Sequence, residues 1–82
     1  MNDLKPIHLA ILDILSLKPR AGWYGIAIRL PKYDVELGTD LIADLRFLEK
    51  EGLITRFPAV NPSHDEYELT PRGASIVQQH KS

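Results

Sequence analysis

The chain has 82 residues, 44% of them hydrophobic and 26% charged, with a formal net charge of -1, which together indicate one globular domain around one core. The lack of Cys excludes disulfides and thiolate metal sites, and the near-neutral charge means that any binding of nucleic acid must depend on a local basic patch. No apolar stretch is long enough to span a membrane, and the N-terminal MNDLKP has no signal-peptide layout, so we expect a cytoplasmic protein.

The first expected element is a helix over residues 3–17. Its apolar side chains recur at helical spacing on one face, formed by Leu4, Ile7, Ala10, Ile11, Ile14 and Leu15. Asp3 is expected to cap the N-terminus, and Pro6 is tolerated in the first turn because its missing N–H would lack a partner there anyway. Leu9 falls on the opposite face and Leu12 on its flank, so both are expected on the outer side of the helix.

Two further helices are expected next. A short one runs from about Gly22 or Trp23 until Pro31 stops it, and its apolar contacts come from Tyr24, Ile26, Ala27 and Leu30. The third begins near Gly38, where Thr39 is a suitable N-cap. Its core stripe consists of Leu37, Leu41, Leu45 and Leu48. Its opposite face carries Thr39, Ala43, Arg46, Phe47 and Lys50.

The stretch LEKEGLITRF changes from helical spacing to alternation at Gly52, which can adopt the left-handed conformation that ends a helix. A strand is expected after it, then a turn over residues 61–65 and a second alternating strand in EYELT. Thr70 should cap a last short helix that has Pro71 at its first position and Ala74, Ile76 and Val77 on its apolar side. The order is therefore three helices, a β-hairpin and a short helix, a fold of the α+β class.

Four segments in this order resemble the winged helix-turn-helix transcriptional regulators of the PadR-like and MarR-like type. They are HLAILDILSLKP, YGIAIRL, LRFLEKEGLITR and YELTPRGASIV, and the most specific signal is LEKEGLI followed after the turn by YELTPRG. The resemblance covers nearly the whole chain and implies a single winged-helix domain over residues 1–82. It also implies that the third helix, about residues 39–51, lies in the major groove of double-stranded DNA, with a wing over about residues 53–70. The function implied is sequence-specific regulation of transcription, not an enzymatic one.

The resemblance also selects candidate DNA-contacting residues. They are Thr39, Asp40, Ala43, Arg46, Phe47, Lys50, Arg56, Lys32 and His64. Arg46 and Lys50 are one helical turn apart, and an Arg there could reach guanine O6 and N7 while the Lys contacts a phosphate. Base specificity is assigned mainly to Thr39, Ala43 and Arg46, and phosphate contact to Lys50, Arg56 and Lys32.

Two residues of the third helix have open interpretations. Phe47 could contact a thymine methyl, bind a protein partner, or pack against the loop around residues 33–35. Asp44 is expected beside the core stripe, where it would support Arg46 or Arg29.

A second function therefore stays possible. The wing segment NPSHDEYE contains no Arg or Lys and carries three acids, although wings that contact DNA are commonly basic. The alternative is a winged-helix module for protein–protein interaction, which would use Phe47 and this acidic wing.

Apolar residues at both ends of the chain are candidates for a homodimer interface. They are Leu9, Leu12, Ile76 and Val77, unless the last helix simply packs over the first and covers them. The three histidines lie on separate elements without a shared spacing, so we expect no metal site. No motif for a cofactor or for catalysis is evident. The expected partners are therefore double-stranded DNA and a second copy of the chain.

Overall fold

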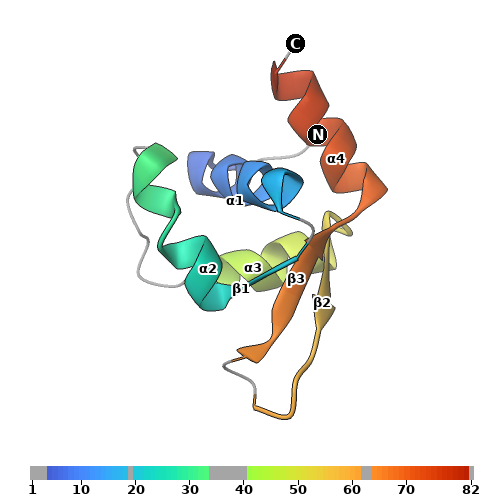
Figure 1. Ribbon diagram of the computed structural model, residues 1–82. Coiled ribbons are helices and arrows are strands. Elements are labelled where there is room, and N and C mark those ends of the chain that lie inside the picture. Colours follow the sequence, from blue (N-terminus) through green and yellow to red (C-terminus); the bar gives the residue numbers. More distant parts are fainter. Residues whose placement is uncertain (1–3, 19, 34–40, 62–63, 82) are drawn as a thin grey trace.

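A computed structural model describes residues 4–18, 20–33, 41–61 and 64–81 of the chain. The elements are α1 (Pro6–Leu17), β1 (Ala21–Gly22), α2 (Trp23–Ala27), the 3-10 helix η1 (Leu30–Tyr33), α3 (Leu41–Lys50), β2 (Ile54–Phe57), β3 (Glu66–Leu69) and α4 (Pro71–Lys81). Helix α4 lies near α1 at one end of the molecule, and the β2–β3 hairpin extends from the other (Figure 1). The expected α+β order is confirmed. No helix in this described part of the chain is long and apolar enough to cross a membrane.

Helix α1 begins at Pro6, as expected for a residue without an N–H. The backbone N–H of Lys5 donates to Nδ1 of His8 at 3.1 Å, so a side chain three residues further on provides an acceptor at this helix end. Asp3, the expected cap, lies outside the described residues. His8 itself is buried, because it continues the stripe of Leu4 and Ile11 at helical spacing.

The hydrophobic core is built around α1. Its fully buried side chains are Ile11, Leu12, Ile14, Ile26, Leu30, Leu45, Leu48 and Leu53. The expected core faces of α1 and of the described part of α3 are therefore confirmed. The expectation that Leu12 lies on the outer side of α1 is wrong, since its exposed fraction is 0%. Helices α2, η1, α3 and α4 and strand β3 all contact α1, so α1 buries more than one stripe.

The second helix is shorter than expected. Helix α2 ends at Ala27, and the chain passes through a turn into η1. Ile26 and Leu30 are buried, as predicted, but Tyr24 is 68% exposed and contributes little to the core. Five residues make little more than one turn, so only one face of α2 meets the core.

The corner after α3 has the predicted conformation. Gly52 has a φ of 77°, and its N–H donates to the carbonyl of Glu49 at 3.0 Å. The N–H of Leu53 donates to the carbonyl of Leu48, also at 3.0 Å. These two bonds form a Schellman motif, in which the apolar residues Leu48 and Leu53 are buried together. The corner directs the chain from α3 straight into the β2–β3 hairpin.

Thr70 joins this corner to the last helix. Its hydroxyl donates to the carbonyl of Gly52 at 2.7 Å and accepts from the N–H of Gly73 at 3.1 Å, which confirms it as the cap of α4. Its own N–H donates to the carbonyl of Leu53 at 3.1 Å. The segments LEKEGLI and YELTPRG are therefore in direct contact.

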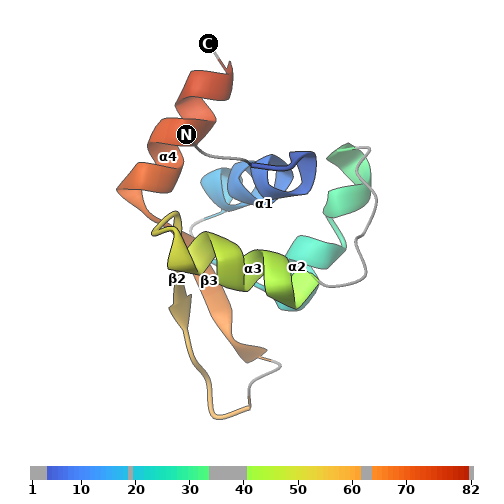
Figure 2. The ribbon, with the colours of Figure 1, turned by 180° about the vertical axis from the view of Figure 1, so that it is seen from behind.

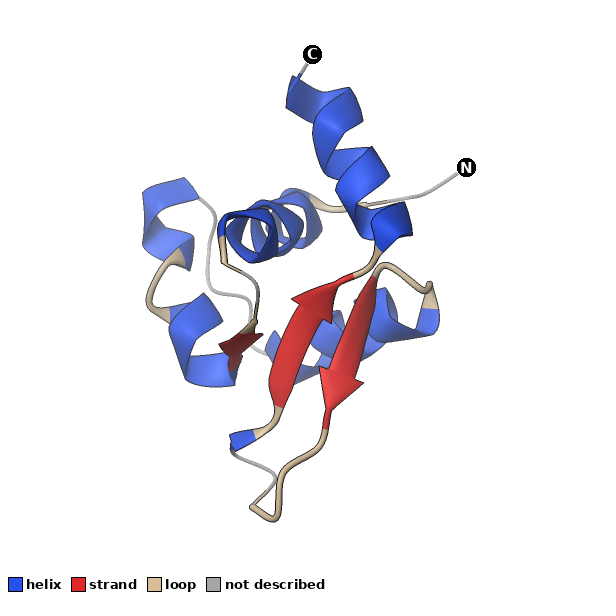
Figure 3. Cartoon of the chain, turned by 45° about the vertical axis from the view of Figure 1, so that its right-hand side comes forward, coloured by secondary structure: helices blue, strands red, loops and turns tan. Residues whose placement is uncertain are grey.

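The sheet is antiparallel and has the strand order β1–β3–β2. Strand β2 pairs with β3 so that Ile54 lies opposite Leu69 and Arg56 opposite Tyr67, which confirms the hairpin. Strand β1 pairs with the other edge of β3 and was not predicted, because two residues are too short for a period to show (Figure 3). Burial, followed by the nearby Asp65 carboxylate, raises the pKa of the inward-facing Tyr67.

Candidate nucleic-acid interface

Helix α3 turns one side to the core and another to solvent. Leu41, Leu45 and Leu48 are buried, whereas Arg46 and Lys50 are exposed on the far side together with Ala43. Arg46 and Lys50 form no ion pair with any described residue, so their charges are available to a ligand. Thr39 and Asp40, two further candidates from the sequence, lie outside the described residues.

One flank of α3 is fixed against α1 by His8. Its Nε2 lies 3.1 Å from Oδ1 of Asp44, and its ring stacks on Phe47 with centroids 4.8 Å apart and an interplanar angle of 20°. Asp44 was expected to support Arg46 or Arg29. This prediction is wrong, because the partner of Asp44 is His8. Phe47 is half-buried against the core, neither fully available to DNA nor exposed to a protein partner.

The other flank of α3 is fixed against the wing by Arg56. Its Nε lies 3.7 Å from Oε1 of Glu49, and its Nη1 lies 3.2 Å from Oδ2 of the buried Asp65. Asp65 also accepts the backbone N–H of Ala59 at 2.7 Å and so holds the two arms of the wing together. Arg56 thus lies between two carboxylates, and its role as a phosphate contact stays a prediction.

A groove separates α3 from the wing. Its volume is about 450 Å³, and it is lined by Ile42, Arg46, Glu49, Arg56, Asp65 and Tyr67. Arg46 reaches this groove from the exposed side of α3, next to the carboxylates that hold Arg56. The charged lining of the groove thus consists of two arginines and two carboxylates, and Arg46 is the arginine that forms no ion pair with a described residue.

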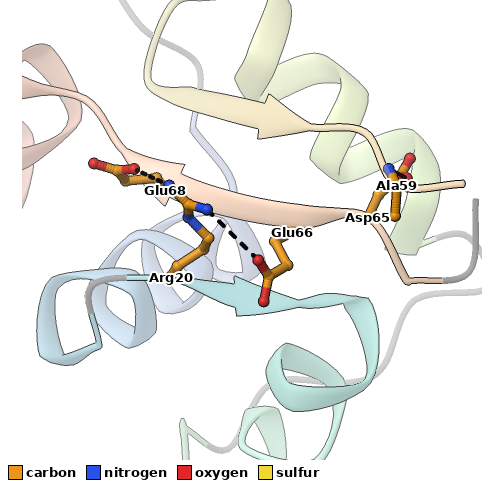
Figure 4. Close-up of polar contacts among 5 residues, drawn as sticks. All are labelled: Arg20, Ala59, Asp65, Glu66 and Glu68. Carbon is orange, nitrogen blue, oxygen red and sulfur yellow. Dashed lines mark hydrogen bonds and ion pairs between the residues drawn. The ribbon is translucent and has the colours of Figure 1, made fainter.

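Two acids on the outer face of the wing, Glu66 and Glu68, share one arginine. Arg20 precedes β1, and its guanidinium lies 3.7 Å from Glu66 and 3.4 Å from Glu68 (Figure 4). The guanidinium also lies 3.9 Å from the ring centroid of Phe57. With Asp65 paired to Arg56, all three wing acids have basic partners. The alternative of a protein partner recognised through Phe47 and an acidic wing is not supported.

The two remaining basic candidates lie apart from this face. Lys32 is exposed in η1, which packs on α1, while the hairpin loop extends from the opposite end of the molecule (Figures 1 and 2). His64 is exposed in the wing loop, where its backbone N–H donates to the carbonyl of Asn61 at 2.8 Å. The structure therefore brings together Arg46, Lys50 and the wing, but not Lys32. Within the described ranges no three His, Asp or Glu side chains are close enough to hold a metal ion.

Half of the expected dimer surface belongs to the monomer's own core. Leu12 is 0% and Val77 is 7% exposed, because α4 packs over α1. Those two assignments are wrong, whereas Leu9 and Ile76 are only partly buried. Leu9 lines a cavity of about 390 Å³ between α1, η1 and α4, together with Pro6, Ala10, Asp13, Tyr33, Val77 and His80.

One phenol beside this cavity is tightly held. The hydroxyl of Tyr33 donates to Oδ2 of Asp13 at 2.7 Å. Burial, and then this hydrogen bond to a carboxylate, raise the pKa of Tyr33 to about 12. The contact fastens η1 to the middle of α1.

No family model and no curated protein matches the chain by sequence. Among solved structures, a PadR family transcription regulator from hypervirulent Clostridium difficile is similar, with a TM-score of 0.78 and 21% identity over 94% of this chain and 84% of that one. A MarR family transcriptional regulator from Silicibacter pomeroyi has a TM-score of 0.74 and 26% identity over 93% of this chain and 49% of its own. The oxidized form of MarR from E. coli has a TM-score of 0.71 and 26% identity, over 94% of this chain and 52% of its own.

The structural neighbours are thus PadR and MarR family transcription regulators, and the predicted winged helix-turn-helix fold is confirmed. The chain spans about half the length of these two MarR family structures but most of the PadR family structure.

Proposed function

We propose that the chain is a transcriptional regulator that binds double-stranded DNA in a sequence-specific manner, with α3 in the major groove and the β2–β3 hairpin as a wing. One observation carries the proposal. Both flanks of α3 are tied into the protein, and the face between them presents Arg46 and Lys50 to solvent. The likeness to PadR and MarR family regulators supports the same role and gives no reason to propose an enzyme.

The side chains on this face suit different parts of a duplex. Arg46 carries a planar fork of donors that matches O6 and N7 of guanine, which makes it the candidate for base recognition. Lys50 is a flexible point charge at the C-terminal end of α3 and suits a phosphate. Ala43 is small, so it lets the helix backbone approach the base edges and can meet a thymine methyl.

Three further candidates complete the proposed interface. Thr39 and Asp40 precede the described part of α3, at the end that enters the groove in helix-turn-helix proteins. His64 is exposed in the wing loop, within reach of the adjacent backbone. Because the formal net charge is -1, affinity must come from these few contacts, and its salt dependence should correspond to a small number of phosphates.

We also propose that the regulator acts in the cytoplasm as a homodimer on a two-fold symmetric site. Leu9 lines the apolar cavity between α1, η1 and α4, and Ile76 on α4 is only partly buried, which gives a second copy an apolar surface to cover. Sedimentation at micromolar concentration, with and without DNA, should show a dimer. A monomer under both conditions would exclude this assembly.

Selection from a pool of random duplexes tests the proposed function. At low salt the protein should enrich a common sequence, and its affinity for that sequence should fall as salt rises. At higher salt the enrichment should persist more than non-specific binding does, because base contacts add to phosphate contacts. If no duplex is retained at low salt, the chain is not a DNA-binding regulator.

A further inference from the structure

His8 is the buried polar residue that connects α1 with the recognition helix. Its exposed fraction is 3%, and it contacts two residues of α3 at once. Its Nε2 lies 3.1 Å from Asp44, and its ring stacks on Phe47 at 4.8 Å. The base-reading face of α3 contains neither of these residues, so His8 has no direct part in the proposed contacts with DNA.

The hydrogen bonds of the ring determine its tautomer. Nδ1 lies 3.1 Å from the backbone nitrogen of Lys5, which can only donate, so Nδ1 must be the acceptor. The proton of the neutral ring is then on Nε2, where it is donated to Asp44. A flip of the ring would break both bonds, so the first turn of α1 fixes the direction in which Nε2 points.

The contacts of α3 place this bond on one side of the helix. Successive residues of a helix are about 100° apart around its axis, so Asp44 and Phe47 are about 60° apart and lie on the same flank of the leucine stripe. Glu49 lies on the other flank of this stripe. Glu49 is held by Arg56 of the wing, as described above. The exposed face with Arg46 lies between the two flanks, so each brace opposes rotation of α3 about its axis.

Rotation is the movement to which the interface is most sensitive. The apolar contacts of the leucines are non-directional, whereas a hydrogen bond weakens when its geometry changes. With a helix radius of about 5–6 Å including side chains, a rotation of about 20° moves a surface group by about 2 Å. That displacement is enough to break a bidentate contact with a base, while a phosphate contact made by a long Lys side chain can adjust.

We infer that His8 is a positioning residue: through Asp44 and Phe47 it sets the rotation of α3, and it thereby determines base selectivity more than overall affinity for DNA. The inference rests on the proposed DNA-binding function. It assigns to a buried histidine of α1 a role in specificity at a distance from the DNA.

Two substitutions separate positioning from simple stability. His8→Phe retains an aromatic ring to stack on Phe47 but loses both hydrogen bonds, whereas Asp44→Asn keeps an oxygen that can accept from Nε2. Ser75→Phe introduces a phenylalanine at an exposed position of α4 that does not line the cavity beside Leu9, and it is the control. For each variant we would measure unfolding by urea, then affinity for a selected duplex and for a scrambled one under conditions where the protein is folded.

His8→Phe should lower the ratio of selected to scrambled affinity about tenfold, comparable to the loss of one base contact. Its affinity for scrambled DNA and its salt slope should not change. Asp44→Asn and Ser75→Phe should keep the ratio within about twofold of the parent. The inference is wrong if His8→Phe preserves the ratio, or if it lowers the affinity for both duplexes equally.

A second measurement does not depend on DNA. Nitrogen-15 spectra of the parent should show a protonated Nε2 and an unprotonated Nδ1 at His8. Residual dipolar couplings should show that α3 is rotated relative to α1 in His8→Phe but not in Ser75→Phe. The opposite tautomer, or an unchanged orientation of α3, would overturn the inference. If no duplex binds even to the parent, the proposed function fails, and these spectra still decide whether His8 positions α3.

Discussion

Replacing Gly73 by Ala should destabilise the protein far more than the same change at Gly52. A Cβ added at Gly73 would lie 2.8 Å from Cδ1 of Leu69 and would overlap the carbonyl oxygen of Leu53. That carbonyl cannot move freely, because it accepts the N–H of Thr70 at 3.1 Å. Helix α4 must therefore shift away from the corner after α3, and the cost should be about 3 kcal/mol, at the upper end for overpacking.

The same substitution at two other glycines gives stability changes with which Gly73→Ala can be compared. A Cβ at Gly52 would meet no atom within 4 Å, so Gly52→Ala costs only the left-handed conformation, about 1 kcal/mol. At Gly25 the nearest atom, Nη1 of Arg29, is 3.5 Å away, which is an ordinary contact. Gly25→Ala should therefore be neutral or stabilising by about 0.5 kcal/mol, as expected for Ala over Gly in a helix.

Urea unfolding of the three variants, compared with the parent at one temperature, gives the differences directly. The expected order of stability is Gly25→Ala, then Gly52→Ala, then Gly73→Ala. The close contact between α4 and the corner does not exist as described if the free energy of unfolding of Gly73→Ala is within about 1 kcal/mol of the parent's, or is higher than that of Gly52→Ala.

Two further predictions concern polar groups that hold the fold together. Asp65→Ala should lower the free energy of unfolding by about 2 kcal/mol, because it removes a buried carboxylate that accepts hydrogen bonds from Ala59 and Arg56. It should also speed amide hydrogen exchange at Ala59, and an unchanged exchange rate would contradict this account. The pKa of Tyr33 is raised from 10.0 to about 12, so the folded chain keeps this proton in a pH range where the unfolded chain loses it, and stability should fall as pH rises through this range. Tyr33→Phe should show a smaller fall when unfolding is measured at pH 9 to 11, and an equal fall in both proteins would show that the phenol is not held by Asp13.

The fold could be predicted because its signals are local. The corner depends on a glycine between a helical and an alternating segment, and the last helix on the pair Thr70 and Pro71. Each of these residues determines the backbone within a few positions of itself, so neighbours in sequence suffice to recognise it. Strand β1 escaped prediction because two residues show no period, and it forms only because β3 offers a free edge.

The candidate site was harder to predict because its braces link distant segments. Arg56 was expected to contact a phosphate, and the sequence did not show that Glu49 and Asp65 are its partners within the protein. Asp44 was expected to support an arginine, yet its partner is His8, 36 positions away. Helical spacing does place His8 on the apolar stripe of α1, a signal from which its burial could have been inferred. What a buried polar side chain contacts depends on how the helices pack, which local spacing does not specify.

The central claim is that the exposed face of α3 reads DNA. The most direct test titrates a labelled duplex, carrying the selected sequence, with the parent, Arg46→Ala and Lys50→Ala at several salt concentrations. Arg46→Ala should cost about 1–3 kcal/mol and relax the preference at one base position. Lys50→Ala should weaken binding to all sequences alike and reduce the salt slope by about one. If both variants bind as tightly as the parent, with the same base preference and salt slope, α3 is not the recognition helix.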